Sequence, residues 1–338
     1  MAKRWNASSS PHWRDASSTA SLMRDVCVAL IPALGFSVWY FGRQALTVII
    51  VCVLSSVAAE YLYQRHAKKP VRVNDWSAVV TGLLLAMNLP PTAPWWMCAI
   101  GSAIAIILIK QIFGGIGQNF LNPALGARTI LMISWATLMT ATVVGRGSGE
   151  ALDAVSQATS VDALTQATPL ALSLVNSRSP YTASQLFLGT VPGMLGETSK
   201  LALLIGGAYL LVRRVITWHI PVTFILTVFV LFLIQTGTVW EDGSSQSALY
   251  QTLSGGLILS AFFMATDYVT SPITPLGKAI MGVGCGLILW VIRAFNPSYP
   301  EGCSFAILFM NLLTPLINRA FRPIWFGETK AGEVKGGA

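Results

Sequence analysis

Long apolar stretches alternate with short polar segments along most of this chain. A helix needs about 20 apolar residues to cross the hydrocarbon core of a bilayer, and about ten stretches approach that length. Their apolar residues are continuous rather than alternating, which argues against a transmembrane β-barrel. The pattern predicts an all-α integral membrane protein with about ten transmembrane helices. The predicted spans are residues 26–41, 44–63, 76–88, 95–112, 123–142, 200–216, 219–236, 252–266, 277–294 and 303–320.

Two of these spans are short and end at helix breakers. The third ends at Asn88-Leu89-Pro90-Pro91, and the eighth ends near Asp267, just before Thr270-Ser271-Pro272. Short spans interrupted at matching places in two halves are typical of membrane proteins built from repeats. Because each half has an odd number of spans, the second half must insert upside down. We therefore expect two inverted five-helix repeats with broken third and eighth helices, at 23–142 and 190–322, a loop at 143–189 between them, and tails at 1–22 and 323–338.

Composition agrees with this assignment. The 338 residues are 54% hydrophobic and 11% charged, whereas soluble domains are roughly a quarter charged. The first 22 residues have no apolar core of a signal peptide. Five cysteines are scattered without CxxC spacing, which favours buried apolar residues over metal ligands. The net charge of +8 fits either nucleic-acid binding or basic cytoplasmic loops, and we favour the loops, with lipid rather than nucleic acid as the partner.

The lysines and arginines set the expected orientation, because cytoplasmic loops carry an excess of them. We place the spans in a bacterial inner membrane with both termini in the cytoplasm. Most basic residues of the tails and loops then fall on the cytoplasmic side. Only a few fall outside: Arg43, Arg146, Arg178, Lys200 and Arg293. This orientation makes 143–189 an extracytoplasmic loop.

That loop holds a near-duplicate, rich in hydroxyl groups. Asp153-Ala-Val-Ser-Gln-Ala-Thr159 is followed by Asp162-Ala-Leu-Thr-Gln-Ala-Thr168. Chance similarity in a Ser/Thr/Ala-rich loop is one explanation. Pro169 favours an extended backbone at Thr168, which would present its side chain.

The second copy resembles the D-x-x-[ST]-G-A-T-P-L flavinylation motif of the RnfD/NqrB family. Its members are the RnfD component of the Rnf ferredoxin:NAD⁺ oxidoreductase and the NqrB component of the sodium-pumping NADH–quinone oxidoreductase. The resemblance implies that Thr168 carries FMN, joined through the flavin phosphate. Gln166 stands where the family has glycine, so Thr159 stays open as a rival, as does a scaffold that has lost its flavin. Thr168 is preferred because only it is followed by Pro-Leu.

Five further stretches carry the resemblance in the same order, over about residues 20–322. They are Asp75–Pro91, Phe113–Ala124 (FGGIGQNFLNPA), Gly193–Ser199, Met264–Asp267 and Tyr299–Asn311. The chain lacks a long N-terminal extension, which makes it more similar to the Rnf component.

Some residues of these stretches are candidate ligands. Gly193–Ser199 opens the sixth span, where free N–H groups of a helix attract anions. We expect the flavin or its phosphate to lie against Gly196, Glu197, Thr198 and Ser199. An ordinary helix cap would have the same sequence.

Asn119 and Asn122 are candidates for binding a cation or a second, noncovalent flavin, since the resemblance implies riboflavin in a relative. A glycine-rich turn with Asn caps is the alternative. Arg128 would face a ligand anion or anchor the helix at the cytoplasmic interface. Asp267, at a membrane discontinuity, is a candidate ion ligand, whereas Glu60 is expected to be a solvated, structural carboxylate near the interface.

The resemblance implies a redox component of an ion-translocating complex that relays electrons between ferredoxin and NAD⁺, coupled to Na⁺ or H⁺ movement. The chain has no Rossmann glycine motif and no cysteine cluster, so NAD⁺ and ferredoxin must bind elsewhere, and we expect no turnover by this chain alone. Expected partners are the FMN-carrying RnfG, the small membrane proteins RnfA and RnfE, and a flavin transferase. The alternative is an inverted-repeat transporter or channel without a redox role.

Overall fold

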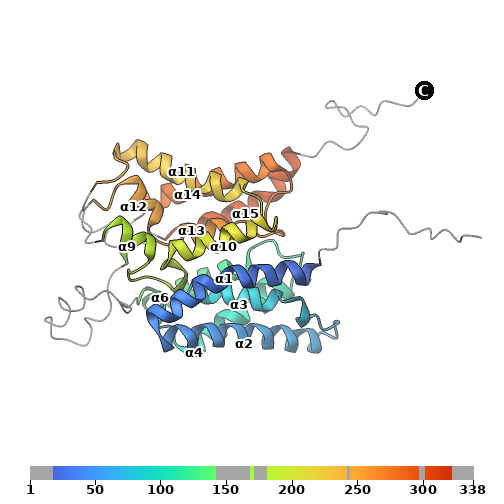
Figure 1. The fold of residues 1–338 in the computed structure, drawn as a ribbon. Coiled ribbons are helices and arrows are strands. Elements are labelled where there is room, and N and C mark those ends of the chain that lie inside the picture. Colours follow the sequence, from blue (N-terminus) through green and yellow to red (C-terminus); the bar gives the residue numbers. More distant parts are fainter. Residues whose placement is uncertain (1–17, 142–167, 171–180, 242–243, 297–300, 322–338) are drawn as a thin grey trace, which may run out of the picture.

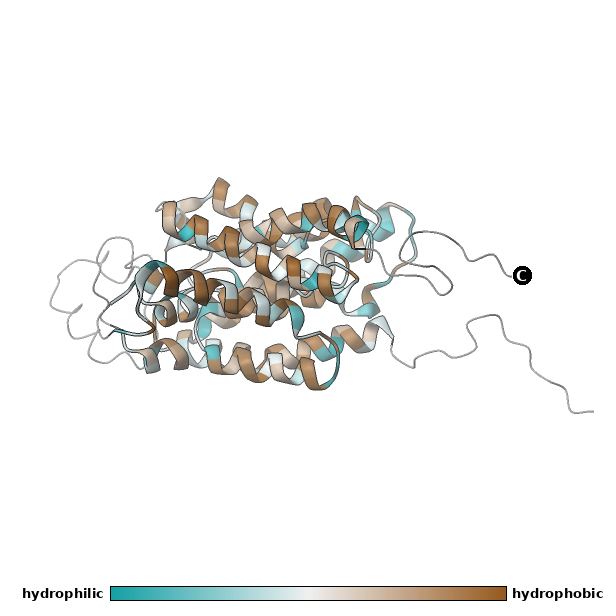
Figure 2. Ribbon diagram, turned by 90° about the horizontal axis from the view of Figure 1, so that it is seen from above, coloured by the Kyte–Doolittle hydropathy of each residue, from teal (hydrophilic) through white to brown (hydrophobic). Residues whose placement is uncertain are grey.

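The computed structural model describes residues 18–141, 168–170, 181–241, 244–296 and 301–321 (Figure 1). Within these ranges the chain is all-helical and has no extended strand. Five helices are long and apolar enough to cross a membrane: α1 (Thr19–Phe41), α2 (Arg43–His66), α11 (His219–Thr236), α14 (Pro275–Phe295) and α15 (Cys303–Ala320). Hydrophobic residues dominate their length in Figure 2. The protein is therefore a helical membrane protein, as the apolar pattern predicted.

The remaining helices are shorter, and several follow one another with breaks. In the first half they are η1 (Val73–Asp75), α3 (Ser77–Met87), α4 (Trp95–Ala103), the π-helix η2 (Ile104–Gln111), α5 (Pro123–Ser134) and α6 (Ala136–Thr140). Later in the chain they are α9 (Ala183–Leu188), η4 (Leu195–Glu197), α10 (Lys200–Val212), α12 (Ala248–Leu253), α13 (Leu257–Leu259) and the π-helix η5 (Ser260–Met264).

The predicted seventh and tenth spans coincide with α11 and α15. The first begins earlier than expected, because the Ser18 side chain caps α1. The third ends at Met87, just before the Pro90-Pro91 pair, as predicted. The eighth is more interrupted than expected, because α12 ends at Leu253 and Gly255 adopts a positive φ of 67° before α13 begins.

Helices from the two halves of the sequence occupy opposite sides of the molecule and meet along α1 and α10 (Figure 1). The two helices approach closely because Gly206 has no side chain. A Cβ at Gly206 would lie 2.0 Å from the Ala29 carbonyl oxygen. The halves also meet where α5 packs against α15 and where η4 packs against α1 and α3.

The ends of the short helices meet in the interior. The Asn88 amide, after α3, donates to the Leu84 carbonyl oxygen at 2.6 Å and lies 3.5 Å from Met264 Sδ. The Asn122 amide, before α5, donates to the Met264 carbonyl oxygen at 3.1 Å. Beside them, the Leu195 N–H donates to the Leu89 carbonyl oxygen at 3.2 Å. Backbone groups that no helix satisfies are thus satisfied by protein, as an apolar surrounding requires.

The α1–α10 contact leads to a stability prediction. Gly206→Val would force the two backbones apart, and overpacking of this kind typically costs about 1–3 kcal/mol. We expect a lower thermal unfolding midpoint for the variant in detergent. Gly35→Val is the matched control, because Gly35 is an exposed α1 residue with no atom within 4 Å of an added Cβ. Equal midpoints for the two variants would contradict this packing.

Candidate functional site

The described part of the predicted flavinylation motif, Thr168-Pro169-Leu170, packs against the second half of the protein. Thr168 is half-buried, and Leu170 is fully buried. The buried Tyr250 hydroxyl, on α12, donates to the Pro169 carbonyl oxygen at 3.0 Å. The predicted rival Thr159 and the first copy of the duplicate lie outside the described residues. Thr168 is therefore held at the edge of the helical bundle, one residue from an anchored carbonyl.

The turn after α12 links this segment to Arg293 of α14. The Arg293 guanidinium donates to the carbonyl oxygens of Gln251 and Ser254, the latter at 3.2 Å. A Cβ at Gly255 would lie 3.2 Å from both Arg293 Nη2 and Leu170 Cδ2. The guanidinium and the Leu170 side chain thus both lie against Gly255.

A cluster of five buried charged side chains lies around this turn and the start of α10. We call it the buried charge cluster; each member is at most 8% exposed: Arg128, Glu197, Lys200, Arg293 and Glu301. Arg128 Nη2 forms an ion pair with Glu301 and lies 3.8 Å from Glu197 Oε1. Its Nη1 donates to the Ser304 hydroxyl at 2.8 Å. Because α5 carries Arg128 and later elements carry the carboxylates, these contacts join the two halves.

The Gly193–Ser199 stretch is part of this region. The Ser199 hydroxyl caps α10 by accepting from the Ala202 N–H at 3.2 Å, and Thr198 Oγ1 donates to the Leu195 carbonyl oxygen at 3.1 Å. Lys200 Nζ donates to the Glu197 and Thr198 carbonyl oxygens. A Cβ at Gly196 would lie 2.7 Å from the Met87 carbonyl oxygen. The stretch thus caps α10 as the alternative expected, and it also supplies the buried Glu197.

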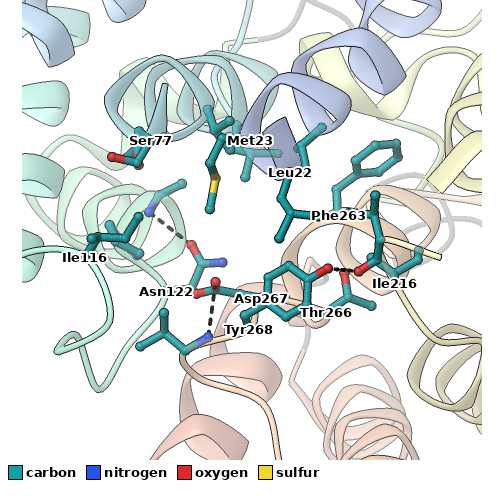
Figure 3. A pocket seen from close by; sticks show the side chains of 18 of the residues that line it. Leu22, Met23, Ser77, Ile116, Asn122, Ile216, Phe263, Thr266, Asp267 and Tyr268 are labelled. Carbon is teal, nitrogen blue, oxygen red and sulfur yellow. Dashed lines mark hydrogen bonds between the residues drawn. The ribbon is translucent and has the colours of Figure 1, made fainter. Parts of the chain in front are cut away.

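A separate cavity of about 100 Å³ lies between the two halves (Figure 3). Leu22 and Met23 of α1 form one wall, and Asn122 and Asp267 lie on the other. Further lining residues are Ser77, Thr81, Lys110, Asn119, Phe262, Phe263 and Thr266. The cavity combines aromatic and apolar walls with a few amide and carboxylate groups, as sites for small organic molecules commonly do.

The two asparagines and Asp267 already have protein partners at this cavity. Asn122 caps α5 by accepting from the Ala124 and Leu125 N–H groups, and the Asn119 amide donates to the Leu121 carbonyl oxygen at 3.1 Å. Asp267 is half-buried and accepts from the Val269 N–H at 3.5 Å and the Thr270 hydroxyl at 3.3 Å. Both asparagines are buried. Because they and Asp267 line the same cavity, the structure brings these predicted residues together.

Glu60 differs from the prediction of a solvated carboxylate. It is 1% exposed, and Lys110 Nζ lies 3.0 Å from its Oε2. The amides of Gln111 and Gln64 donate to its Oε1 at 2.6 and 3.2 Å. The prediction was wrong because η2, which carries Lys110 and Gln111, packs against α2, and periodicity alone does not reveal a contact between separate helices.

Comparison with known proteins adds independent information. The sequence profile of the NQR2, RnfD, RnfE family matches residues 6–327. The chain belongs to this family. The D subunit of the Na(+)-translocating ferredoxin:NAD(+) oxidoreductase complex of Acetobacterium woodii is 47% identical over 326 residues, covering 96% of this chain and 95% of the relative. The counterpart from the proton-translocating complex of Clostridium ljungdahlii is 41% identical, with 96% of each chain covered. The D subunit of the ion-translocating oxidoreductase complex of Halorhodospira halophila is 39% identical, with 95% of each covered.

Family membership confirms the resemblance on which the predictions rested, and the structure adds that three basic residues of the predictions are buried. Arg128 is not an interface anchor, because it is 2% exposed and paired with Glu301. Lys200 and Arg293, which were predicted to fall on the outer side of the membrane, are buried within the protein. The cause is shared: short and broken helices bring polar chain ends inside the bundle. A charged residue inside or beside an apolar run indicates a buried, functional charge. This pattern made Arg128 a candidate, and Arg293 and Glu301 have the same pattern.

The buried charge cluster leads to a second stability prediction. Removing one member of a buried ion pair typically costs about 3–5 kcal/mol, because the partner charge is left uncompensated. We expect Arg128→Met to lower the thermal midpoint strongly, and Arg128→Met with Glu301→Gln to recover part of the loss. Arg213→Met is the control, since Arg213 pairs with Asp25 at the surface with a 57% exposed side chain. A double variant no more stable than Arg128→Met would contradict the pairing.

Proposed function

We propose that this chain is the RnfD component of an ion-translocating ferredoxin:NAD⁺ oxidoreductase complex and that it carries FMN covalently on Thr168. The observation that carries the proposal is the combination of family membership with the position of the motif. Thr168 lies at the edge of the bundle, half-buried, on a segment anchored by Tyr250. A threonine held in this way suits a permanently attached cofactor that must stay in one place.

The attachment needs a hydroxyl and an activated flavin. Oxygen of the Thr168 side chain would form a new bond to the flavin phosphorus, and its proton would leave. A pyrophosphate donor such as flavin adenine dinucleotide balances the step, because its P–O–P bond breaks and AMP departs. A separate transferase would catalyse this exchange.

The residues around Thr168 fit such a group. Leu170 and Tyr250 fix the segment, and the buried charge cluster beside it has three cations and two carboxylates, so its surroundings favour an anion. When bound, FMN supplies one-electron chemistry, and the protein supplies position and electrostatics. The expected partners are other components of the complex: the FMN-carrying RnfG, the membrane proteins RnfA and RnfE, and, for maturation, the transferase. NAD⁺ and ferredoxin would bind other components of the complex.

The membrane arrangement that we propose is two inverted five-helix repeats with both termini in the cytoplasm and Thr168 on the outer side of the inner membrane. Helix packing supports the repeat. In the first half α2 contacts α3 and α4, and in the second half α11 contacts α12 and α14. The proposed first helices of each half, α1 and α10, contact each other, as do the last, α5 and α15.

The cavity of Figure 3 is the proposed place for a second ligand. Its aromatic and amide groups suit a noncovalent flavin such as riboflavin, with Asn119 and Asn122 holding its polar edge. Asp267 would serve an ion pathway instead. The relatives are named for both Na⁺ and proton translocation, so the family does not decide which ion moves.

The covalent flavin is tested by in-gel fluorescence. After co-expression with a flavin transferase, the denatured full-length chain should fluoresce under ultraviolet light, and Thr168→Val should abolish the signal. Thr159→Val is the matched control and should leave the signal unchanged. A fluorescent Thr168→Val band would show that the flavin is attached to another residue. A wild-type band without fluorescence would contradict the covalent flavin.

The second ligand is tested in the Thr168→Val background, which removes the covalent flavin. Denaturing this chain should release free flavin, detected by its fluorescence in the supernatant. Asn119→Leu should reduce the release, because it removes an amide from the cavity while Asn122 still caps α5. If neither the Thr168→Val chain nor the same chain with Asn119→Leu releases flavin, the noncovalent flavin is ruled out.

A further inference from the structure

Three buried polar atoms gather at the turn after α12 without a hydrogen-bond partner among the described residues. They are Arg293 Nε, Ser254 Oγ and Gln251 Oε1. Arg293 is 5% exposed and Ser254 is fully buried. Burying a polar atom without a partner costs free energy, and such atoms are rare in folded proteins. Two of these three atoms are hydrogen-bond donors on neighbouring groups, so the place suits an acceptor.

The charge balance points to the same place. The buried charge cluster sums to one excess positive charge, with Arg128, Lys200 and Arg293 against Glu197 and Glu301. Within the described residues, Arg293 has no carboxylate at ion-pair distance, whereas Arg128 has two. Cys303, Glu301 and Glu197 also interact electrostatically with Arg293. An uncompensated buried charge destabilises the folded protein. One more anion at this place would balance the charge of the cluster.

The Thr168 segment reaches this place. Arg293 donates to the Ser254 carbonyl oxygen, and both its guanidinium and Leu170 lie against Gly255. Tyr250, on the helix before that turn, holds the Pro169 carbonyl oxygen. A side chain at Gly255 would press against both Arg293 and the segment that carries Thr168.

We propose that Arg293 and Ser254 bind the phosphodiester through which the flavin is attached to Thr168. This inference rests on the proposed function. A phosphodiester carries one negative charge and two free acceptor oxygens, which match the one excess positive charge and the two free donors. A guanidinium is well suited to phosphate oxygens, because its N–H groups form a planar fork. Gln251 offers only an acceptor atom and takes no part.

The test is a double-mutant cycle on the full-length chain, co-expressed with the transferase and purified in detergent. Thermal midpoints are measured for the wild type, Arg293→Gln, Thr168→Val and the double variant. Arg293→Gln should lower the midpoint by about 2–4 °C more in the flavin-loaded chain than in the Thr168→Val chain, because only the loaded chain loses a phosphate contact. Equal shifts in the two backgrounds would overturn the inference.

Arg213→Gln is the matched control, since it removes the same charge from an exposed position. It should have the same effect with and without flavin. Gel fluorescence of each sample separates the two proposals. A dark wild-type chain would defeat the proposed function, whereas a fluorescent wild type with additive midpoints would defeat only the role of Arg293 and Ser254.

A milder variant covers the case in which Arg293→Gln does not fold or does not accept flavin. Ser254→Ala removes only a hydroxyl that has no partner among the described residues, so the unloaded chain should be unaffected. The loaded chain should have a lower midpoint, because the phosphate loses a donor. A Ser254→Ala cycle that is additive with Thr168→Val would overturn the inference independently.

Discussion

The structure depends on how an apolar protein satisfies the polar ends of helices that stop inside it. Neither lipid nor an aliphatic core offers partners to free N–H and carbonyl groups. The ends of α3, η5 and α5 satisfy this constraint by meeting one another through Asn88, Asn122 and Met264. Both candidate sites adjoin this meeting point: the cavity on one side, and the buried charge cluster on the other. Helix breaks would leave backbone groups unsatisfied if they faced lipid. Here they create a polar interior in which charged groups and cofactors can be held.

The two sites differ in the kind of ligand that their chemistry accepts. The cavity has aromatic and apolar walls with a few amides, and its polar groups are already partnered within the protein. The turn after α12 has donors without partners among the described residues and an excess cation. One place therefore suits a mostly apolar, planar molecule, and the other suits an anion. A redox protein that holds two flavins by different means would need both kinds of place.

Local sequence patterns predicted the parts of this arrangement that local physics determines. Apolar run lengths gave α11 and α15, and prolines located the end of α3. The Thr-Pro-Leu string marked the anchored segment. The charge cluster was only partly predicted, because Arg293, Glu197 and Glu301 come from separate elements and meet only when the halves fold together. Glu60 was misjudged for a similar reason: its partners Lys110 and Gln111 are 50 and 51 residues away. Pairings between residues far apart in the chain have no signature in a single sequence.

The π-helix η2 has a consequence for how tolerant this part of the chain is to change in length. A π turn corresponds to an α-helix with an added residue, accommodated as a bulge. Each residue of an α-helix advances the side-chain direction by about 100°. Because the bulge absorbs that added residue, shortening Ile104–Ile109 by one residue would let the helix relax to regular α geometry with Lys110 and Gln111 still facing Glu60. This segment can therefore lose one residue and still present both partners to the buried carboxylate, so its length is more tolerant of change than that of an ordinary helix.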